Sequence, residues 1–262
     1  MQTHTIGDHL REWRQRRRLS QLDLALEAEI STKHLSFLET GRAQPSREMV
    51  LRLSERLDVP LRERNVLLVS AGFAPVFPQR PLGDPALGPA RKAVDLVLKG
   101  HEPYPALAID RHWTLIAHNA AVPPLLLAAD ATLLQPPVNV LRLSLHPKGL
   151  APRIANLAEW RAHLLTRLRQ QIDVTADGEL IKLLDELSSY PAPSGAKAPR
   201  ATVSEEYAGV VVPLRFVTDA GTLSLFSTTT IFGTPVDITL SELAIESFFP
   251  ADAATAELLR AR

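Results

Sequence analysis

The chain has 262 residues, a formal net charge of zero and 45% hydrophobic residues. This length favours two domains, and the hydrophobic content is sufficient for a buried core in each. The absence of cysteine excludes disulfides, thiol catalysis and cysteine-ligated metal centres, and it suits a reducing cytoplasm. No signal peptide or membrane-spanning stretch is apparent, so we expect a soluble, cytoplasmic protein without a membrane partner.

Residues 1–72 are predicted to be entirely helical. Apolar residues recur there at helical spacing, and no strand-like alternation occurs. The expected helices cover residues 6–17, 21–28, 32–39, 46–57 and 61–70. Suitable N-cap residues are Ser20, Ser31 and Ser46, and Gly41 and Gly72 fit C-terminal turns.

Residues 20–42, SQLDLALEAEISTKHLSFLETGR, predict two short helices joined by a tight turn. The positions that must pack inward are Leu24, Ala25, Ile30, Leu35 and Leu38. The outward residues of the second helix are then Thr32, Lys33, Ser36 and Phe37. A helix presented in this way can enter the major groove of DNA.

This stretch resembles the lambda-repressor/Cro-like, XRE-type helix-turn-helix family, over about residues 6–72. The residues that match the family pattern are Gln21, Ala25, Ile30, Ser31, Leu35, Glu39, Gly41, Arg42, Pro45 and Ser46. The resemblance implies that Gln21 and Arg42 hold DNA phosphates. It implies that the base-facing residues are Thr32, Lys33, Ser36 and Phe37. It also implies that Arg14 pairs with Glu39 and locks the first helix onto the recognition helix.

The chemistry of the outward residues agrees with base contact. Lysine can donate to guanine, threonine and serine can donate or accept, and Phe37 could touch a thymine methyl group. Two alternatives stay open: a plain helical bundle with Lys33 and Arg42 merely solvated, and a dimer or interdomain contact for Phe37. A basic cluster, whose residues either face phosphates or are solvated, consists of Arg14, Arg16, Arg17 and Arg18.

Residues 73–92 are predicted to connect two domains. Five prolines occur between Phe73 and Ala90, a density that forbids a regular helix or a central strand. An extended, semi-rigid connector is expected instead. The domain boundary is therefore placed here, between residues 1–72 and residues 93–262.

Residues 93–262 are predicted to form a PAS-like α+β domain. PALAIDRHWTLIAHNAA (residues 105–121) indicates two short strands around a turn at residues 110–112, then a helix from about Asn119. Helices are expected at residues 152–171 and 178–188. Three further strands, GVVVPLRFV, TLSLFSTTTIF and VDITLSELAIESFF, should form an antiparallel meander with turns at residues 219–221 and 233–235.

The segments PSREMVLRLSERLDVPLRERNVLLVSAGFAP, YPALAIDRHWTLIAHNAA and LHPKGLAPRIANLAEW resemble the MmyB-like transcription regulators. That resemblance spans nearly the whole chain and implies that a small apolar molecule, with a fatty acid as one candidate, binds the PAS-like domain. The aliphatic positions that could line its cavity, or equally pack as a closed core, are Leu107, Ile109, Leu115, Val210, Val212, Leu214, Phe216 and Leu225. Candidate cations for a ligand carboxylate are Arg111, Arg142 and Arg215.

Catalytic and metal-binding motifs are lacking in the sequence, so neither an enzyme nor a cofactor is expected. The function that follows is a sequence-specific transcriptional regulator, binding a pseudo-palindromic double-stranded operator as a homodimer. One alternative is a regulator whose second domain docks a protein or dimerises and takes no small molecule. An antitoxin-like DNA binder is disfavoured, because such proteins rarely need a large second domain.

Overall fold

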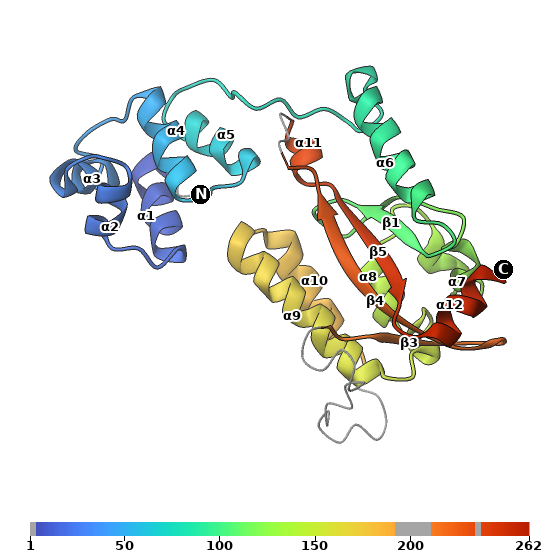
Figure 1. Ribbon diagram of the computed structural model, residues 1–262. Helices are drawn as coiled ribbons and strands as arrows, with labels where there is room; N and C mark the ends of the chain where they lie inside the picture. The colour runs from blue at the N-terminus through green and yellow to red at the C-terminus, as the bar shows by residue number, and fades with distance from the viewer. Residues whose placement is uncertain (1–3, 192–210, 234–236, 262) are drawn as a thin grey trace. The chain divides into compact units, whose positions relative to one another are not determined.

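The computed structural model describes residues 4–191, 211–233 and 237–261 (Figure 1). The chain divides into two compact units, which we describe separately. The helical unit comprises residues 1–80 with the segments 173–176 and 235–241. The sheet unit comprises residues 81–172, 177–234 and 242–262. None of the helices in the described ranges has the length and hydrophobicity needed to cross a bilayer.

The predicted helices of the first 72 residues are confirmed. They are α1 (Ile6–Arg16), α2 (Gln21–Glu27), α3 (Thr32–Glu39), α4 (Arg47–Arg56) and α5 (Leu61–Ser70). The three predicted N-caps are also confirmed, since the hydroxyls of Ser20, Ser31 and Ser46 each accept a hydrogen bond from a backbone N–H in the first helical turn. Their shared core includes Leu10, Trp13, Leu24, Leu35, Leu38 and Leu53.

A close approach of α1 to the end of α3 explains the glycine at position 7. A Cβ atom on Gly7 would lie 2.6 Å from the carbonyl oxygen of Leu38 and 2.7 Å from that of Glu39. No side chain fits in that space. Gly7 therefore sets the distance at which α3 is held against the rest of the helical unit.

Two left-handed residues shape the turns on either side of α3. Gly41 has a φ of 72°, as expected for the residue that ends this helix. Glu29, in the turn between α2 and α3, has a φ of 56°. A residue with a Cβ atom gives up about 1 kcal/mol in that conformation, so the surrounding core must hold the turn in place.

The sheet unit is built on a five-stranded antiparallel sheet with the strand order β2-β1-β5-β4-β3. The strands are β1 (Ala106–Ile109), β2 (Leu115–His118), β3 (Leu214–Thr218), β4 (Gly221–Ile231) and β5 (Ala244–Pro250). The first and second strands flank a turn in which Asp110 accepts from the N–H groups of His112 and Thr114. The predicted α+β organisation with an antiparallel sheet is confirmed.

Helices cover both faces of this sheet. On one face, Val94 and Leu98 of α6 (Gly88–Gly100) pack against Ala106, Ala108 and Ile245. The other face packs against α8 (Val140–Leu145), α9 (Leu157–Thr175) and α10 (Gly178–Ser189). The remaining helices of the unit are the short α7 (Pro123–Leu126) and α12 (Ala253–Arg260), and the 3-10 turns η1 (Pro85–Leu87), η2 (Ala131–Leu134) and η3 (Ala151–Arg153).

The helices in this half correct the prediction in four places. Helix α6 begins at Gly88, inside the expected connector, because Pro89 lies in its first turn where the N–H has no helical partner. Neither α8 nor α12 was expected. Asn119 does not start a helix: it is buried, and its amide donates to the carbonyls of Leu98 and Tyr104.

The last three strands pair as the predicted meander but with different limits. The segment expected as a strand from Val236 forms α11 (Ile238–Ser241) before β5 begins at Ala244. Part of the first expected strand and part of the 233–235 turn lie outside the described residues. Ile231 is 68% exposed because it lies at the end of β4, whereas Leu223 and Leu225, earlier in the strand, are buried.

Within the helical unit, α11 holds the connector. The backbone N–H of Ile238 donates to the carbonyl of Pro78 at 2.9 Å, and the Thr239 hydroxyl donates to the carbonyl of Arg80 at 2.6 Å. The Arg80 guanidinium pairs with Asp237, which is fully buried, at 3.1 Å. The chain between β4 and β5 therefore contributes a segment to the helical unit.

Candidate functional site

Helix α3 turns the residues predicted from the sequence away from the core. Leu35 and Leu38 are 0% exposed, so the opposite face of the helix is turned away from the core. On that opposite face Lys33 is exposed, and Thr32, Ser36 and Phe37 are half-buried. Three hydrogen-bonding side chains and one aromatic ring thus lie together on a short helix, which is a composition suited to contacts with base edges.

Two cations flank the Phe37 ring. The Lys33 ammonium lies 5.7 Å from the ring centroid, and the Arg42 guanidinium carbon lies 5.9 Å from it. The chain turns tightly after α3, since the N–H groups of Arg42 and Ala43 both donate to the carbonyl of Phe37. Two positive charges therefore lie beside an aromatic ring on this side of α3.

A buried ion pair fixes α3 to α1, as the XRE-type resemblance implies. Arg14 donates to both carboxylate oxygens of Glu39, with Nε–Oε1 at 2.6 Å and Nη2–Oε2 at 2.9 Å. Gln21 Nε2 donates to Glu39 Oε2 at 2.8 Å. Glu39 is only 2% exposed. The Arg14–Glu39 pairing is confirmed, and the Gln21 amide is oriented by the same carboxylate.

Burial and hydrogen bonding act in opposite directions on Glu39. Burial raises its pKa, whereas the hydrogen bonds from Arg14 and Gln21 and the charge of Arg11 lower it, and the net pKa lies below the usual value. The carboxylate is therefore ionised at neutral pH, and the recognition helix is held by a charged network rather than by neutral contacts.

The basic cluster expected at the end of α1 is only partly available to DNA. Arg14 is committed to Glu39, and Arg17 donates to the carbonyls of Leu57 and Asp58 at 2.8 and 2.7 Å while stacking on Trp13. Arg17 thus caps the end of α4. Among these arginines, Arg16 and Arg18 are exposed.

His4, His9 and Glu12 gather at the start of α1, with their potential ligand atoms within 4.8 Å of one another. His4 Nδ1 lies 3.3 Å from Glu12 Oε1, and both side chains are more than half exposed. An exposed contact of this kind explains their approach, so no metal site is assigned to them.

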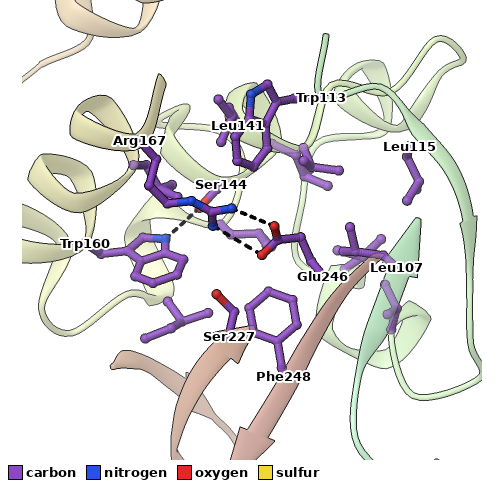
Figure 2. A pocket seen from close by; sticks show the side chains of 17 residues that line it. Leu107, Trp113, Leu115, Leu141, Ser144, Trp160, Arg167, Ser227, Glu246 and Phe248 are labelled. Carbon is purple, nitrogen blue, oxygen red and sulfur yellow. Dashed lines mark hydrogen bonds and ion pairs between the residues drawn. The ribbon is translucent and has the colours of Figure 1, made fainter. Parts of the chain in front are cut away.

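The sheet unit contains a cavity of about 110 Å³ between its sheet and the helices α8 and α9 (Figure 2). Its apolar wall includes Leu107, Leu115, Leu141, Leu143, Leu164, Leu214 and Phe248. Both tryptophans of this unit, Trp113 and Trp160, also line it. The cavity therefore offers a mainly hydrocarbon surface.

A second buried ion pair forms the polar part of the cavity wall. Arg167 Nη2 lies 2.7 Å from Glu246 Oε1, and Arg167 Nη1 lies 3.2 Å from Glu246 Oε2. Thr229 completes the cluster, accepting from Arg167 at 2.9 Å and donating to Glu246 at 2.7 Å. The guanidinium also lies 5.0 Å from the Trp113 ring centroid. The hydroxyl-bearing side chains of Ser144 and Ser227 also line the cavity (Figure 2).

Comparison with known families agrees with this organisation. Residues 90–261 match the family model described as "MmyB-like transcription regulator ligand binding domain". The chain belongs to the MmyB-like transcription regulators. Residues 10–64 match a helix-turn-helix model. This MmyB-like regulator therefore joins a DNA-binding module to a ligand-binding domain in one chain.

A search of curated proteins gives no match. Among solved structures, the chain is similar to "Structure of an RNA-binding Light-Oxygen-Voltage Receptor", with 13% identity, 98% of this chain covered and a TM-score of 0.28. The chain spans 61% of that protein's length. A TM-score this low does not establish a common fold.

The expected ligand-binding residues of the MmyB-like domain fall into two groups. Leu107, Leu115 and Leu214 line the cavity. The others that the structure describes pack in the neighbouring core and do not border the cavity, namely Ile109, Val212, Phe216 and Leu225. Val210 lies outside the described residues. Strand alternation identifies the buried face, but the helices packed on that face decide where a gap remains.

Arg167, the cation that lines the cavity, was not among the arginines expected from the sequence. Arg111 pairs with Asp177 at 3.0 Å and Arg142 pairs with Glu186 at 2.7 Å, and neither they nor Arg215 lines the cavity. The signal for Arg167 was its position on the apolar stripe that α9 forms with Trp160 and Leu164. The signal for its partner was a lone carboxylate within the apolar strand AIESFF.

Proposed function

We propose that this MmyB-like regulator binds a pseudo-palindromic operator as a homodimer in the cytoplasm, and that an apolar ligand in the sheet-unit cavity changes its affinity for that operator. The observation that carries the proposal is the presence, in one chain, of an outward recognition face on α3 and a hydrocarbon-lined cavity. We further propose that the protein acts by binding and performs no catalysis.

The roles proposed on the DNA side follow from position and chemistry. Thr32, Lys33, Ser36 and Phe37 face base edges, and Lys33 is the side chain that can donate to guanine O6 or N7. Gln21, at the start of α2, and Arg42, after α3, contact phosphates, which position the protein without reading sequence. Dimerisation is proposed because one recognition helix reads only half a site.

The ligand is proposed to be small. The cavity of about 110 Å³ is smaller than the roughly 150 Å³ engineered cavity that holds benzene. A short acyl chain therefore matches the cavity, and a longer fatty acid must extend beyond it. Fatty acids and related acyl compounds form the first set to test.

Communication between the two activities is proposed to run through the chain itself. Ser227 on β4 and Glu246 on β5 line the cavity, and the connection between these strands contributes α11 to the helical unit. There Asp237 holds Arg80 of the connector. Asp237→Asn should leave ligand binding and DNA binding intact while reducing the effect of ligand on DNA affinity, as measured by fluorescence anisotropy.

The proposal is tested by selecting an operator from random duplex DNA and measuring its affinity with and without ligand. Native mass spectrometry before and after denaturation identifies any ligand carried by the purified protein. Leu107→Trp should fill the cavity and abolish the ligand response while retaining operator binding. Ile116→Trp, a partly exposed position on the neighbouring strand, is the matched control. An operator affinity that no acyl compound changes would instead support a second domain that docks a protein.

A further inference from the structure

The charge of the cavity wall determines which head group it accepts. Only two of its lining residues carry a charged side chain, Arg167 and Glu246, and they form one ion pair. Glu246 is 4% exposed, so solvent does little to weaken the pair. The wall therefore presents a neutral pair rather than a free cation.

The guanidinium of Arg167 already makes several hydrogen bonds within the protein. It donates to both carboxylate oxygens of Glu246 and to the Thr229 hydroxyl, and the Trp113 ring lies beside it. A ligand carboxylate entering this site would bring a second negative charge next to Glu246. In an apolar cavity that arrangement is unfavourable, because one cation would face two carboxylates.

Two hydroxyl groups remain for a polar ligand atom. Ser144 Oγ accepts from Trp160 Nε1 at 3.0 Å, and within the described chain no acceptor takes its proton. The hydroxyl of Ser227 likewise makes no hydrogen bond within the described ranges. Each hydroxyl can donate to an uncharged oxygen, and Ser227 can also accept from an N–H or O–H group.

We propose that the cavity selects an apolar ligand with an uncharged polar head group, such as a carboxamide or an alcohol, over the corresponding carboxylate. This inference rests on the proposed function and specifies the chemistry of its ligand. The neutral head group adds no net charge beside the Arg167–Glu246 pair, while the hydrocarbon tail contacts leucine and tryptophan side chains.

The test compares matched amide and acid probes at neutral pH, hexanamide with hexanoate and octanamide with octanoate. Each pair has the same chain length and number of non-hydrogen atoms, so the two probes differ mainly in charge. Binding is followed by calorimetry and by tryptophan fluorescence, since Trp113 and Trp160 line the cavity. The amides should bind roughly tenfold tighter than the acids, the ratio that corresponds to one pKa unit of charge interaction.

Glu246→Gln removes the negative charge and leaves the size of the side chain nearly unchanged. Arg167 then becomes an uncompensated cation, and the preference should reverse, with the acids binding tighter than the amides. Glu186→Gln is the control, because it makes the same change at the Arg142–Glu186 pair, which does not line the cavity. This control should keep the wild-type preference.

The possible outcomes separate the two proposals. Acids that bind the wild-type chain as tightly as amides would overturn the head-group inference and leave ligand sensing intact. If no probe of either chain length bound to folded wild-type protein, the sensor proposal and this inference would both fail. The wild-type comparison stands by itself, so it remains decisive even if Glu246→Gln does not fold.

Discussion

The helical unit and the sheet unit each bury an arginine–glutamate pair, and the surroundings of the two pairs differ. In the helical unit, Glu39 accepts hydrogen bonds from Arg14 and from Gln21, and the neighbouring space is filled by core side chains. In the sheet unit, the Arg167–Glu246 pair borders a cavity. Similar residues therefore form a fixed helix contact in one place and part of a cavity wall in the other.

This difference explains why the two candidate sites require different kinds of information. The recognition face of α3 is an outward surface, and helix periodicity alone identifies it. The cavity is lined by strands and helices that come together only on folding. A buried ion pair is therefore informative about function only when its tertiary neighbours are known.

Removing the arginine of each pair should give the largest effect and separate the two environments. Arg14→Met removes both hydrogen bonds that Arg14 donates to the buried Glu39, leaves Arg11 at 3.8 Å, and should cost about 3 kcal/mol of unfolding free energy. Arg167→Met should cost less, about 2 kcal/mol, because the Arg167 side chain is 24% exposed at the cavity wall, whereas that of Arg14 is 12% exposed. Urea unfolding followed by tryptophan fluorescence measures both, with Trp13 reporting on the helical unit and Trp113 and Trp160 on the sheet unit. Equal costs would show that the cavity does not distinguish the two pairs.

Gly7→Ala should disturb the helical unit alone. The added Cβ atom would lie 2.6 Å from the Leu38 carbonyl oxygen, so α1 and α3 must separate, at a cost of about 2 kcal/mol. Gly88→Ala, where nothing lies within 4 Å of the added atom, is the control and should change stability by less than about 0.5 kcal/mol. Thermal denaturation measures both. If Gly7→Ala left the stability unchanged, α1 and α3 would be able to move apart without a cost in folding free energy.

Lys33→Ala and Arg42→Ala should separate base reading from phosphate contact. Lys33→Ala should relax preference at one base pair and weaken the best operator by about 1 to 2 kcal/mol. Arg42→Ala should weaken every sequence by a similar factor and reduce the salt dependence of binding. Anisotropy titrations on operator variants at several salt concentrations measure these effects. The same loss on all operators for both variants would contradict this division.

The pH dependence of Glu39 should give the smallest effect. In the folded chain the pKa of Glu39 lies below the usual glutamate value of 4.5, so the ionised form stabilises the fold. That contribution is complete above the usual pKa and is lost as the pH falls through the lowered, folded-state pKa. Glu39→Gln lacks it, so the stability difference between wild type and variant should shrink in acid. If the stability difference between wild type and Glu39→Gln stayed constant from neutral to acid pH, the charge of Glu39 would not contribute to folding stability.

Sequence patterns predicted the helical unit well because its contacts are close in the chain. The limits of α1 to α5 follow from apolar periodicity, serine N-caps and glycine turns. The sheet unit was predicted less well, since proline density concealed the start of α6 and an apolar pattern placed a strand where α11 forms. Local propensity does not predict that a proline will lie in the first turn of a helix. It also does not predict that a short helix will precede a strand.

By itself, the sequence determined the helix-turn-helix face, the Arg14–Glu39 pair through its family pattern, and the α+β character of the second half. Tertiary structure alone decided that Arg167 and Glu246 meet, and that Leu107, Leu115 and Leu214 border a cavity while Ile109, Phe216 and Leu225 fill a core. The physical reason is that helical periodicity is a local property of the chain. A cavity depends on how distant side chains fill the space between packed elements.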